Sequence, residues 1–88
     1  LMAGRKRNLY RKTAMVKFGK TQRGKFRQRT LQDYMNSYIG TNGRINKHVQ
    51  VSQFELTMLL RYHMNFKYIP EGQSTETGWW IYIEEEEE

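Results

Sequence analysis

The chain has 88 residues and a formal net charge of +6, with 15 lysines and arginines against nine aspartates and glutamates. This length allows one domain with a small core. Because the chain has no cysteine, a disulfide framework and a thiolate zinc site are both excluded. The charged N-terminal segment does not have the pattern of a signal peptide, and no apolar run is long enough to span a bilayer. These properties predict an intracellular protein.

The charge is distributed unevenly along the chain. Residues 1–30 contain 11 basic and no acidic residues, residues 31–83 balance four basic against four acidic residues, and residues 84–88 are five glutamates. Glycines and like charges separate the apolar residues at the N-terminus, so we expect this segment to be disordered when free. The sequence therefore predicts a flexible basic arm over residues 1–29, a compact domain over 30–83 and an acidic tail over 84–88.

The compact domain is predicted to begin with a helix. Thr30 and Asp33 have the spacing of a capping box, which marks the start of a helix. The apolar residues that follow are spaced at i, i+3, i+4, i+7 and i+8, so they lie on one helical face: Leu31, Tyr34, Met35, Tyr38 and Ile39. Gly40 and the pair Asn42-Gly43 then predict the end of the helix and a turn.

A strand and a second helix are predicted next. Residues 45–51 alternate between apolar and polar side chains, which is the period of a strand. Ser52 and Glu55 form a second capping box, and the residues after it predict the strongest helix in the chain, over about 53–64. Its continuous polar stripe consists of Gln53, Thr57, Arg61 and Asn65.

Two aromatic-rich segments, residues 66–70 and 79–84, predict a β-hairpin joined by a long polar loop. Trp79 and Trp80 point to opposite faces of their strand, so we expect one in the core and the other on the surface. The predicted fold class is α+β, with two helices and a small three-stranded antiparallel sheet that follow a disordered basic arm.

This order of elements resembles a winged-helix domain, in which a helix, a short strand, a helix pair and a β-hairpin wing follow one another. The resemblance covers residues 30–84 and implies a recognition helix over 52–64 and a wing over 66–83. The chain departs from the pattern because only residues 45–50 are left for the helix expected before the recognition helix. A helix packed on a three-stranded sheet is the alternative.

The basic residues are the main candidates for a functional site. Cations along a flexible segment neutralise phosphates and release counterions, and Tyr10, Phe18 and Phe26 among them suit stacking on bases. Gln53, Thr57 and Arg61 suit hydrogen bonds to base edges. The alternatives are a solubilising arm and an ordinary solvated helix face. The predicted nucleic-acid-binding residues are Arg5, Lys6, Arg7, Arg11, Lys12, Lys17, Lys20, Arg23, Lys25, Arg27, Arg29, Gln53, Thr57 and Arg61.

The residues give little support to catalysis or to a cofactor. Residues 19–25 match G-x-x-x-x-G-K, but Phe26 replaces the Ser or Thr that would hold magnesium in a P-loop. His48 and His63 are the only histidines and have no cysteine partners for zinc. The few carboxylates outside the tail are explained by helix caps and a loop. We therefore expect no enzyme activity, no metal and no cofactor.

The leading hypothesis is a regulatory or architectural DNA-binding protein, with the arm on the phosphate backbone and the helix or hairpin in a groove. Its basic arm also resembles those of some type II-A phage anti-CRISPR proteins, which implies an inhibitor of a ribonucleoprotein in a host cytoplasm. RNA binding of the ribosomal-protein type is a third hypothesis. The acidic tail is expected either to fold back on the arm or to aid solubility, and dimerisation would stabilise so small a body.

Overall fold

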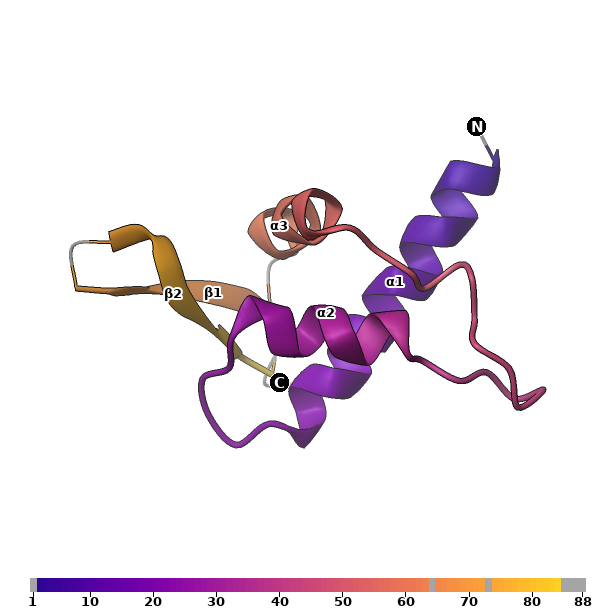
Figure 1. Cartoon of the computed structure of the whole chain (residues 1–88), viewed down its shortest axis with the longest axis horizontal. Helices are drawn as coiled ribbons and strands as arrows, with labels where there is room; N and C mark the ends of the chain where they lie inside the picture. Colours follow the sequence, from indigo (N-terminus) through magenta and orange to yellow (C-terminus); the bar gives the residue numbers. More distant parts are fainter. Residues whose placement is uncertain (1, 64, 73, 85–88) are drawn as a thin grey trace, which may run out of the picture.

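The computed structural model describes residues 2–63, 65–72 and 74–84, and it describes side chains for residues 8–63, 65–72 and 78–84. Three helices precede a β-hairpin, and Figure 1 shows the hairpin and the connection over residues 37–52 projecting on opposite sides of the helices. None of the helices in these ranges is long and apolar enough to cross a membrane. The elements are α1 (Met2–Thr21), α2 (Gln28–Asn36), α3 (Gln53–Tyr62), β1 (Phe66–Glu71) and β2 (Ser74–Tyr82).

The small α+β class is confirmed, but the prediction of two helices and three strands is wrong. The described sheet has two antiparallel strands, β1 and β2. A single bridge from Phe26 occupies the outer side of β2, where its N–H and C=O both pair with Trp80 at 2.8 Å. The α1 helix packs against α2 and β2, while α3 packs against α2 and β1.

The core includes residues from all five elements and from the segments between them. It therefore draws on the predicted arm as well as on the predicted domain. Its buried apolar side chains are Ala14, Met15, Phe18, Phe26, Leu31, Met35, Val49, Val51, Leu56, Leu60, Phe66 and Trp80.

The prediction of a disordered arm is wrong because residues 2–21 form α1. Arg11, Ala14, Met15 and Phe18 are spaced at i, i+3, i+4 and i+7, so they form one helical face, and all four are buried. Lys12, Lys17 and Lys20 are exposed on the remaining circumference, and the many basic residues of this segment conceal the short apolar period in the sequence. The division at residue 30 is corrected with it, because Phe26 also lies in the core.

The α2 helix confirms the first predicted helix, but it begins earlier and without the expected capping box. It starts at Gln28, the N-cap is Arg27, and no side chain caps its first turn. Thr30 therefore lies inside the helix. The apolar face is confirmed for Leu31 and Met35, which are fully buried, but α2 ends at Asn36, before the predicted stop at Gly40. Tyr38 and Ile39 therefore lie beyond the helix, and Ile39 is 63% exposed.

The predicted strand over residues 45–51 is wrong. Only one bridge forms there, between Ile39 and Ile45, and a turn follows it. Asparagine side chains explain the difference, since Oδ1 of Asn46 accepts a hydrogen bond from the backbone N–H of His48 at 2.9 Å. Such a local bond uses a donor that a strand would have to pair. The alternating pattern nevertheless identified two core residues, because Val49 and Val51 are buried, whereas Ile45 is 52% exposed.

The α3 helix and the hairpin are confirmed, but the predicted long polar loop of the hairpin is wrong, because β2 (Ser74–Tyr82) begins within it. Ser52 and Glu55 form the complete capping box, and α3 runs to Tyr62. The hairpin pairs residue 66 with 82 through residue 70 with 78, and its register then shifts next to Glu71. Trp80 is buried and Trp79 is half-buried, as their opposite orientations require.

Candidate nucleic-acid interface

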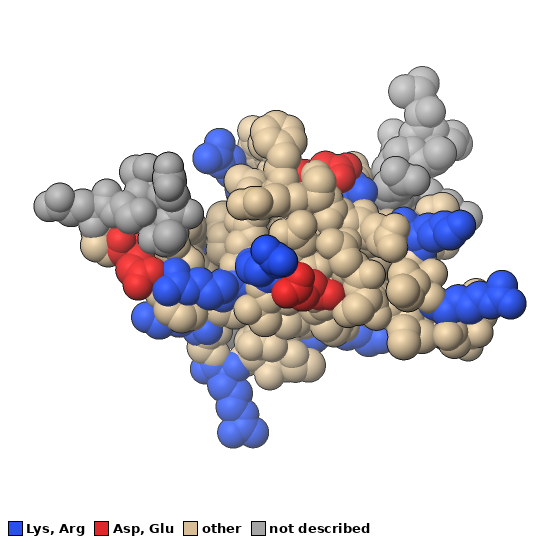
Figure 2. Space-filling model, in the orientation of Figure 1, with Lys and Arg blue, Asp and Glu red and all other residues tan. Residues whose placement is uncertain are grey.

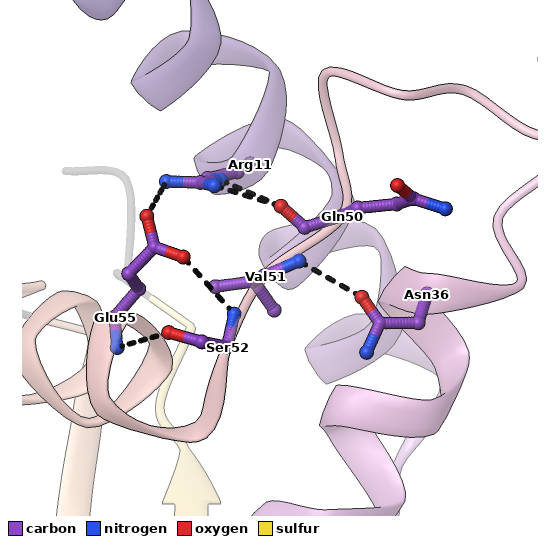
Figure 3. Close-up of polar contacts among 6 residues, drawn as sticks. All are labelled: Arg11, Asn36, Gln50, Val51, Ser52 and Glu55. Atoms are coloured by element: carbon purple, nitrogen blue, oxygen red, sulfur yellow. Dashed lines mark hydrogen bonds and ion pairs between the residues drawn. The ribbon is translucent and has the colours of Figure 1, made fainter.

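Arg11 is the clearest correction among the predicted binding residues, because its side chain is buried inside the protein. Its Nε and Nη2 donate to the carbonyl oxygen of Gln50 at 3.1 and 2.7 Å, and its Nη1 lies 3.0 Å from Oε2 of Glu55 (Figure 3). Only 6% of the residue is exposed. Arg11 therefore joins α1 to the beginning of α3 and is not available to a phosphate.

The same network fixes the entry into α3. The backbone N–H of Ser52 donates to Oε1 of Glu55 at 3.1 Å, and the N–H of Glu55 donates to the Ser52 hydroxyl at 3.1 Å (Figure 3). The hydrogen bond from the Ser52 backbone, with further help from the Arg11 charge, lowers the pKa of Glu55. Oδ1 of Asn36 accepts from the N–H of Val51 at 2.8 Å and holds the chain against α2. The position of α3 therefore depends on both other helices.

The predicted stacking aromatics of the N-terminal segment also serve the core. Phe18 and Phe26 are 5% and 4% exposed and contact each other edge to face, with ring centroids 5.0 Å apart. Tyr10 is half-buried against the core. Stacking of these three rings on bases is therefore not supported as predicted.

Every carboxylate whose side chain the structure describes has a basic partner. Asp33 pairs with Arg29 at 3.2 Å, and Glu71 pairs with Arg27 at 2.6 Å. Glu55 pairs with Arg11, and Glu84 lies 3.9 Å from Lys20. In Figure 2 the acidic groups accordingly lie against basic ones, while other basic side chains project from the outline of the molecule.

This pairing leaves a set of exposed cations with no carboxylate within ion-pair distance among the described side chains. Lys17 instead donates to the Tyr38 hydroxyl at 3.2 Å, and that hydrogen bond raises the pKa of Lys17. The ion pairs are neutral, so the positive charge of the surface comes from these unpaired cations. The set consists of Lys12, Lys17, Arg23, Lys25, Arg44, Lys47, Arg61 and Lys67.

A groove lies between the start of α2, one side of α3 and the hairpin. Two adjoining hollows of about 420 and 350 Å³ share Gln28, Gln53, Tyr68 and Trp80. We call these two hollows the α3–hairpin groove. The aromatic residues Phe66, Tyr68 and Trp80 line one side, and its remaining lining is polar or basic: Arg27, Gln28, Arg29, Gln53, Thr57 and Arg61.

The groove contains the three α3 residues that the sequence singled out. Gln28 organises this part of the lining, since its Nε2 donates to the Gln53 carbonyl oxygen at 3.1 Å and to the Thr57 hydroxyl at 2.7 Å. The Gln53 and Arg61 side chains lie on the exposed surface of α3. Three of the four residues of the predicted stripe, Gln53, Thr57 and Arg61, are therefore brought together beside the hairpin. The fourth, Asn65, lies beyond the end of α3 at Tyr62 and does not line the groove.

Arg27 connects the groove to the outer tryptophan of the hairpin. Its guanidinium carbon lies 3.7 Å from the centroid of the Trp79 ring, and the Nζ of Lys25 lies 4.6 Å from the same centroid. Its Nη1 also donates to Glu71 and, at 3.2 Å, to the Gly78 carbonyl oxygen. The hydrogen bond from Arg27 lowers the pKa of Glu71. Arg27 is thus partly engaged within the protein.

Sequence reasoning missed Gln28 and Tyr68 as lining residues. Gln28 lay inside the segment predicted to be disordered, where no fixed neighbour was expected. Tyr68 belongs to a correctly predicted strand, and the alternation of that strand places it on the same side of β1 as Phe66. This alternation was the available signal.

The remaining predicted cations divide into described and undescribed groups. The side chains of Arg5, Lys6 and Arg7 lie outside the described residues, although their backbone belongs to α1. Lys12, Lys17, Lys20, Arg23 and Lys25 are exposed in or after α1. Residues 85–88 of the acidic tail lie outside the described residues, so only the Lys20–Glu84 approach bears on the predicted contact between tail and arm.

The P-loop pattern and the histidines have structural roles in this fold. Gly19 lies in α1 directly against the Tyr82 ring, where an added Cβ would be 2.5 Å from a ring carbon. This glycine is needed for close packing rather than for a flexible arm. Burial, followed by the charge of Lys12, lowers the pKa of His63. Within the described ranges no three His, Asp or Glu side chains are grouped as a metal site would require.

No protein-family model, no characterised protein and no solved structure matches this chain. Arguments about its function therefore rest on the geometry and charge of its own residues.

Proposed function

We propose that the protein binds nucleic acid without catalysing a reaction, as a regulatory or architectural factor with duplex DNA as the favoured ligand. The observation that carries the proposal is the set of exposed cations left over after every described carboxylate has a basic partner. Such cations neutralise phosphates and release counterions, which gives salt-sensitive binding. The α1 helix contributes as a rigid, positively charged surface instead of a flexible arm.

The α3–hairpin groove supplies groups that suit contacts to base edges. Guanidinium groups such as that of Arg61 pair with guanine, and amides such as that of Gln53 pair with adenine. Arg29, at the start of α2, adds a charge for the phosphate backbone on the same groove. The proposal places α3 and the hairpin beside the bases, with the exposed side chains of Lys17, Arg23 and Lys25 along the backbone.

The order of elements supports a winged-helix arrangement, which we include in the proposal. The bridge of Phe26 takes the place of the short strand, α2 and α3 that of the helix pair, and β1 with β2 that of the wing. The α1 helix comes first and supplies the helix that the sequence seemed to lack. In this arrangement α3 is the recognition helix.

The test measures the affinity of the full chain for labelled duplex DNA and for a structured RNA over a salt series. Deleting residues 1–29 is unsuitable, because this removes Ala14, Met15, Phe18 and Phe26 from the core. Charge substitutions avoid the difficulty. The double variant Arg29→Gln/Arg61→Gln removes two cations from the groove, and its matched control, Arg44→Gln/Lys47→Gln, removes two from the connection between α2 and α3.

We expect the wild type to bind duplex DNA with a steep salt dependence. The groove variant should lower the slope of log K against log salt by about 0.9 for the lost phosphate contact of Arg29, and the loss of Arg61 from a base edge should weaken binding further. The control, with the same change in net charge, should keep most of the affinity. If both variants lose the same affinity for duplex DNA, binding depends on net charge alone and not on the groove. If the wild type binds structured RNA more tightly than duplex DNA, the ligand is RNA. Absence of binding at low salt would refute the proposal.

A further inference from the structure

The α3 helix has a second exposed side that the proposed nucleic-acid interface does not use. Phe54, Met58 and Tyr62 are spaced at i, i+4 and i+8, so they form a continuous apolar ridge. Their exposed fractions are 74%, 36% and 71%. Leu56 and Leu60, on the opposite face, are fully buried. We call the three exposed residues the α3 ridge.

A shallow groove runs between this ridge and α1. The hollow measures about 370 Å³ and is lined by the ridge together with Asn8, Arg11, Lys12, Glu55 and Leu59. Its lining and that of the α3–hairpin groove have no residue in common. The two sides of α3 therefore differ in chemistry, one polar and basic and the other apolar.

The charged residues around the α3 ridge indicate what kind of partner could bind there. Glu55 lies in the hollow, but Arg11 already pairs with it at 3.0 Å. Lys12 is exposed in the same hollow and has no carboxylate partner among the described side chains. The ridge is therefore apolar with a positive border. A second copy of this chain, with net charge +6, would bring like charges together there.

We propose that the α3 ridge and its groove against α1 bind an amphipathic helix of a partner protein, with apolar side chains on the ridge and acidic side chains toward Lys12. Aromatic residues and methionine are enriched at the centres of protein interfaces, and an amphipathic helix lies naturally in an apolar groove. This inference does not depend on nucleic-acid binding. It gives the protein two separate surfaces, so that it would link a partner protein to a nucleic acid.

The probe is a synthetic amphipathic peptide of about 18 residues, or about five helical turns, with leucine on one face and glutamate on the other. A second peptide replaces each glutamate with lysine. Binding to the full chain is followed by fluorescence anisotropy. The ridge variants are Phe54→Ser and Tyr62→Ser, and because both side chains are largely exposed, the fold should tolerate them. Ile39→Ser is the matched control, since Ile39 is 63% exposed and does not line the hollow.

We expect the acidic peptide to bind and the basic peptide not to bind. Each ridge variant should weaken binding about tenfold, while Ile39→Ser should have no effect. Both ridge variants should keep the affinity for duplex DNA, and Arg29→Gln/Arg61→Gln should keep the affinity for the peptide. Failure of this proposal is thus distinguishable from failure of the proposed function.

Three results would overturn the inference. If neither peptide binds, or if both bind equally, the ridge has no preference for an acidic helix. If sedimentation shows a dimer that Phe54→Ser dissociates, the occupant is a second copy of the chain. If Phe54→Ser and Tyr62→Ser weaken binding to single-stranded DNA instead, the ridge is a stacking surface for bases.

Discussion

The helices α1 and α3 both contribute to the core, but only α3 has the local signals of a helix. The capping box of Ser52 and Glu55 is complete at the start of α3. The α1 helix has no acidic residue in its first turn and accumulates like charges along its length. Its buried face of Ala14, Met15 and Phe18 compensates for these unfavourable features. The comparison indicates that α3 is specified locally, whereas α1 depends on tertiary packing.

The largest expected effect follows from removing the central contact of α1. Met15 is fully buried, so Met15→Ala should lower the free energy of unfolding by about 3–4 kcal/mol through lost burial and a cavity. Val16→Ala, at the neighbouring half-buried position, should cost much less. Thermal unfolding followed by circular dichroism measures both.

The form of the Met15→Ala transition tests the comparison itself. If α1 belongs to one cooperative unit, tryptophan fluorescence and helix content should be lost together at the same lower temperature. A variant that loses only the helicity of α1 while Trp80 remains buried would show that α1 is an independent arm, as the sequence predicted.

The next effect concerns the polar junction between the two helices. Arg11→Met retains much of the side-chain volume but removes the hydrogen bonds to the Gln50 carbonyl oxygen and the ion pair with Glu55. We expect a loss of about 2 kcal/mol, as is typical for a hydrogen bond to a charged group. Lys12→Met, at the exposed neighbouring position, should change the free energy of unfolding very little. Denaturant unfolding of the two variants makes the comparison, and equal stability would refute a structural role for Arg11.

The same contrast explains how much of the fold was predictable from the sequence. The α2 face, α3 and the hairpin were found because their periods and caps are local properties. The α1 helix was missed because its four buried residues stand among many cations, and their importance follows only from the packing of α1 against α2 and β2. The strand over 45–51 was wrong because the side chain of Asn46 bonds to the local backbone. Neither the α1 helix nor the irregular segment over 45–51 can be predicted before the residues that contact them in the fold are known.

The candidate site shows the same division. The stripe Gln53, Thr57 and Arg61 was predicted because it lies on one well-specified helix. The residues that complete the groove come from the start of α2 and the residue before it, and from both strands of the hairpin. Gln28 joins the groove through hydrogen bonds to residues 25 and 29 positions away in the sequence. Arg11 looked like any other cation in the sequence, and only burial distinguishes it. Composition therefore identified the cations, and tertiary structure determined which of them are exposed.

A smaller effect compares the capping box at the start of α3, which forms, with the one expected at Thr30, which does not. Ser52→Ala removes the acceptor for the N–H of Glu55, so we expect a loss of about 1 kcal/mol in the free energy of unfolding. Thr30→Ala should change it by less than about 0.5 kcal/mol, because Thr30 is exposed within α2 and does not cap it. Chemical denaturation resolves these values. Similar costs for both substitutions would contradict the assignment of the capping box to α3 alone.

The smallest effect probes, through pH, the electrostatic influence of Lys12 of α1 on His63, the residue that follows α3. Burial and then the Lys12 charge lower the pKa of His63, so the folded protein favours the neutral imidazole. The unfolded chain then binds more protons below the ordinary histidine pKa of about 6.5. The stability contribution of neutral His63 is therefore present above that value and lost as the pH falls toward the lower pKa of the folded state. Unfolding free energies should decrease slightly from about pH 7.5 to about pH 5.5, a range above most carboxyl titration.

Two variants assign this pH dependence to its source. His63→Asn should flatten the profile, and Lys12→Gln should reduce its steepness, because the cation that disfavours imidazolium is gone. Lys47→Gln is the control, since it removes an exposed cation from the connection between α2 and α3 and should leave the decrease unchanged. If Lys47→Gln and Lys12→Gln change the profile equally, the pH dependence reports net charge and not the influence of Lys12 on His63. The effect of Lys12→Gln carries the most weight, because a cation on a free arm would not approach His63 closely enough to influence its proton.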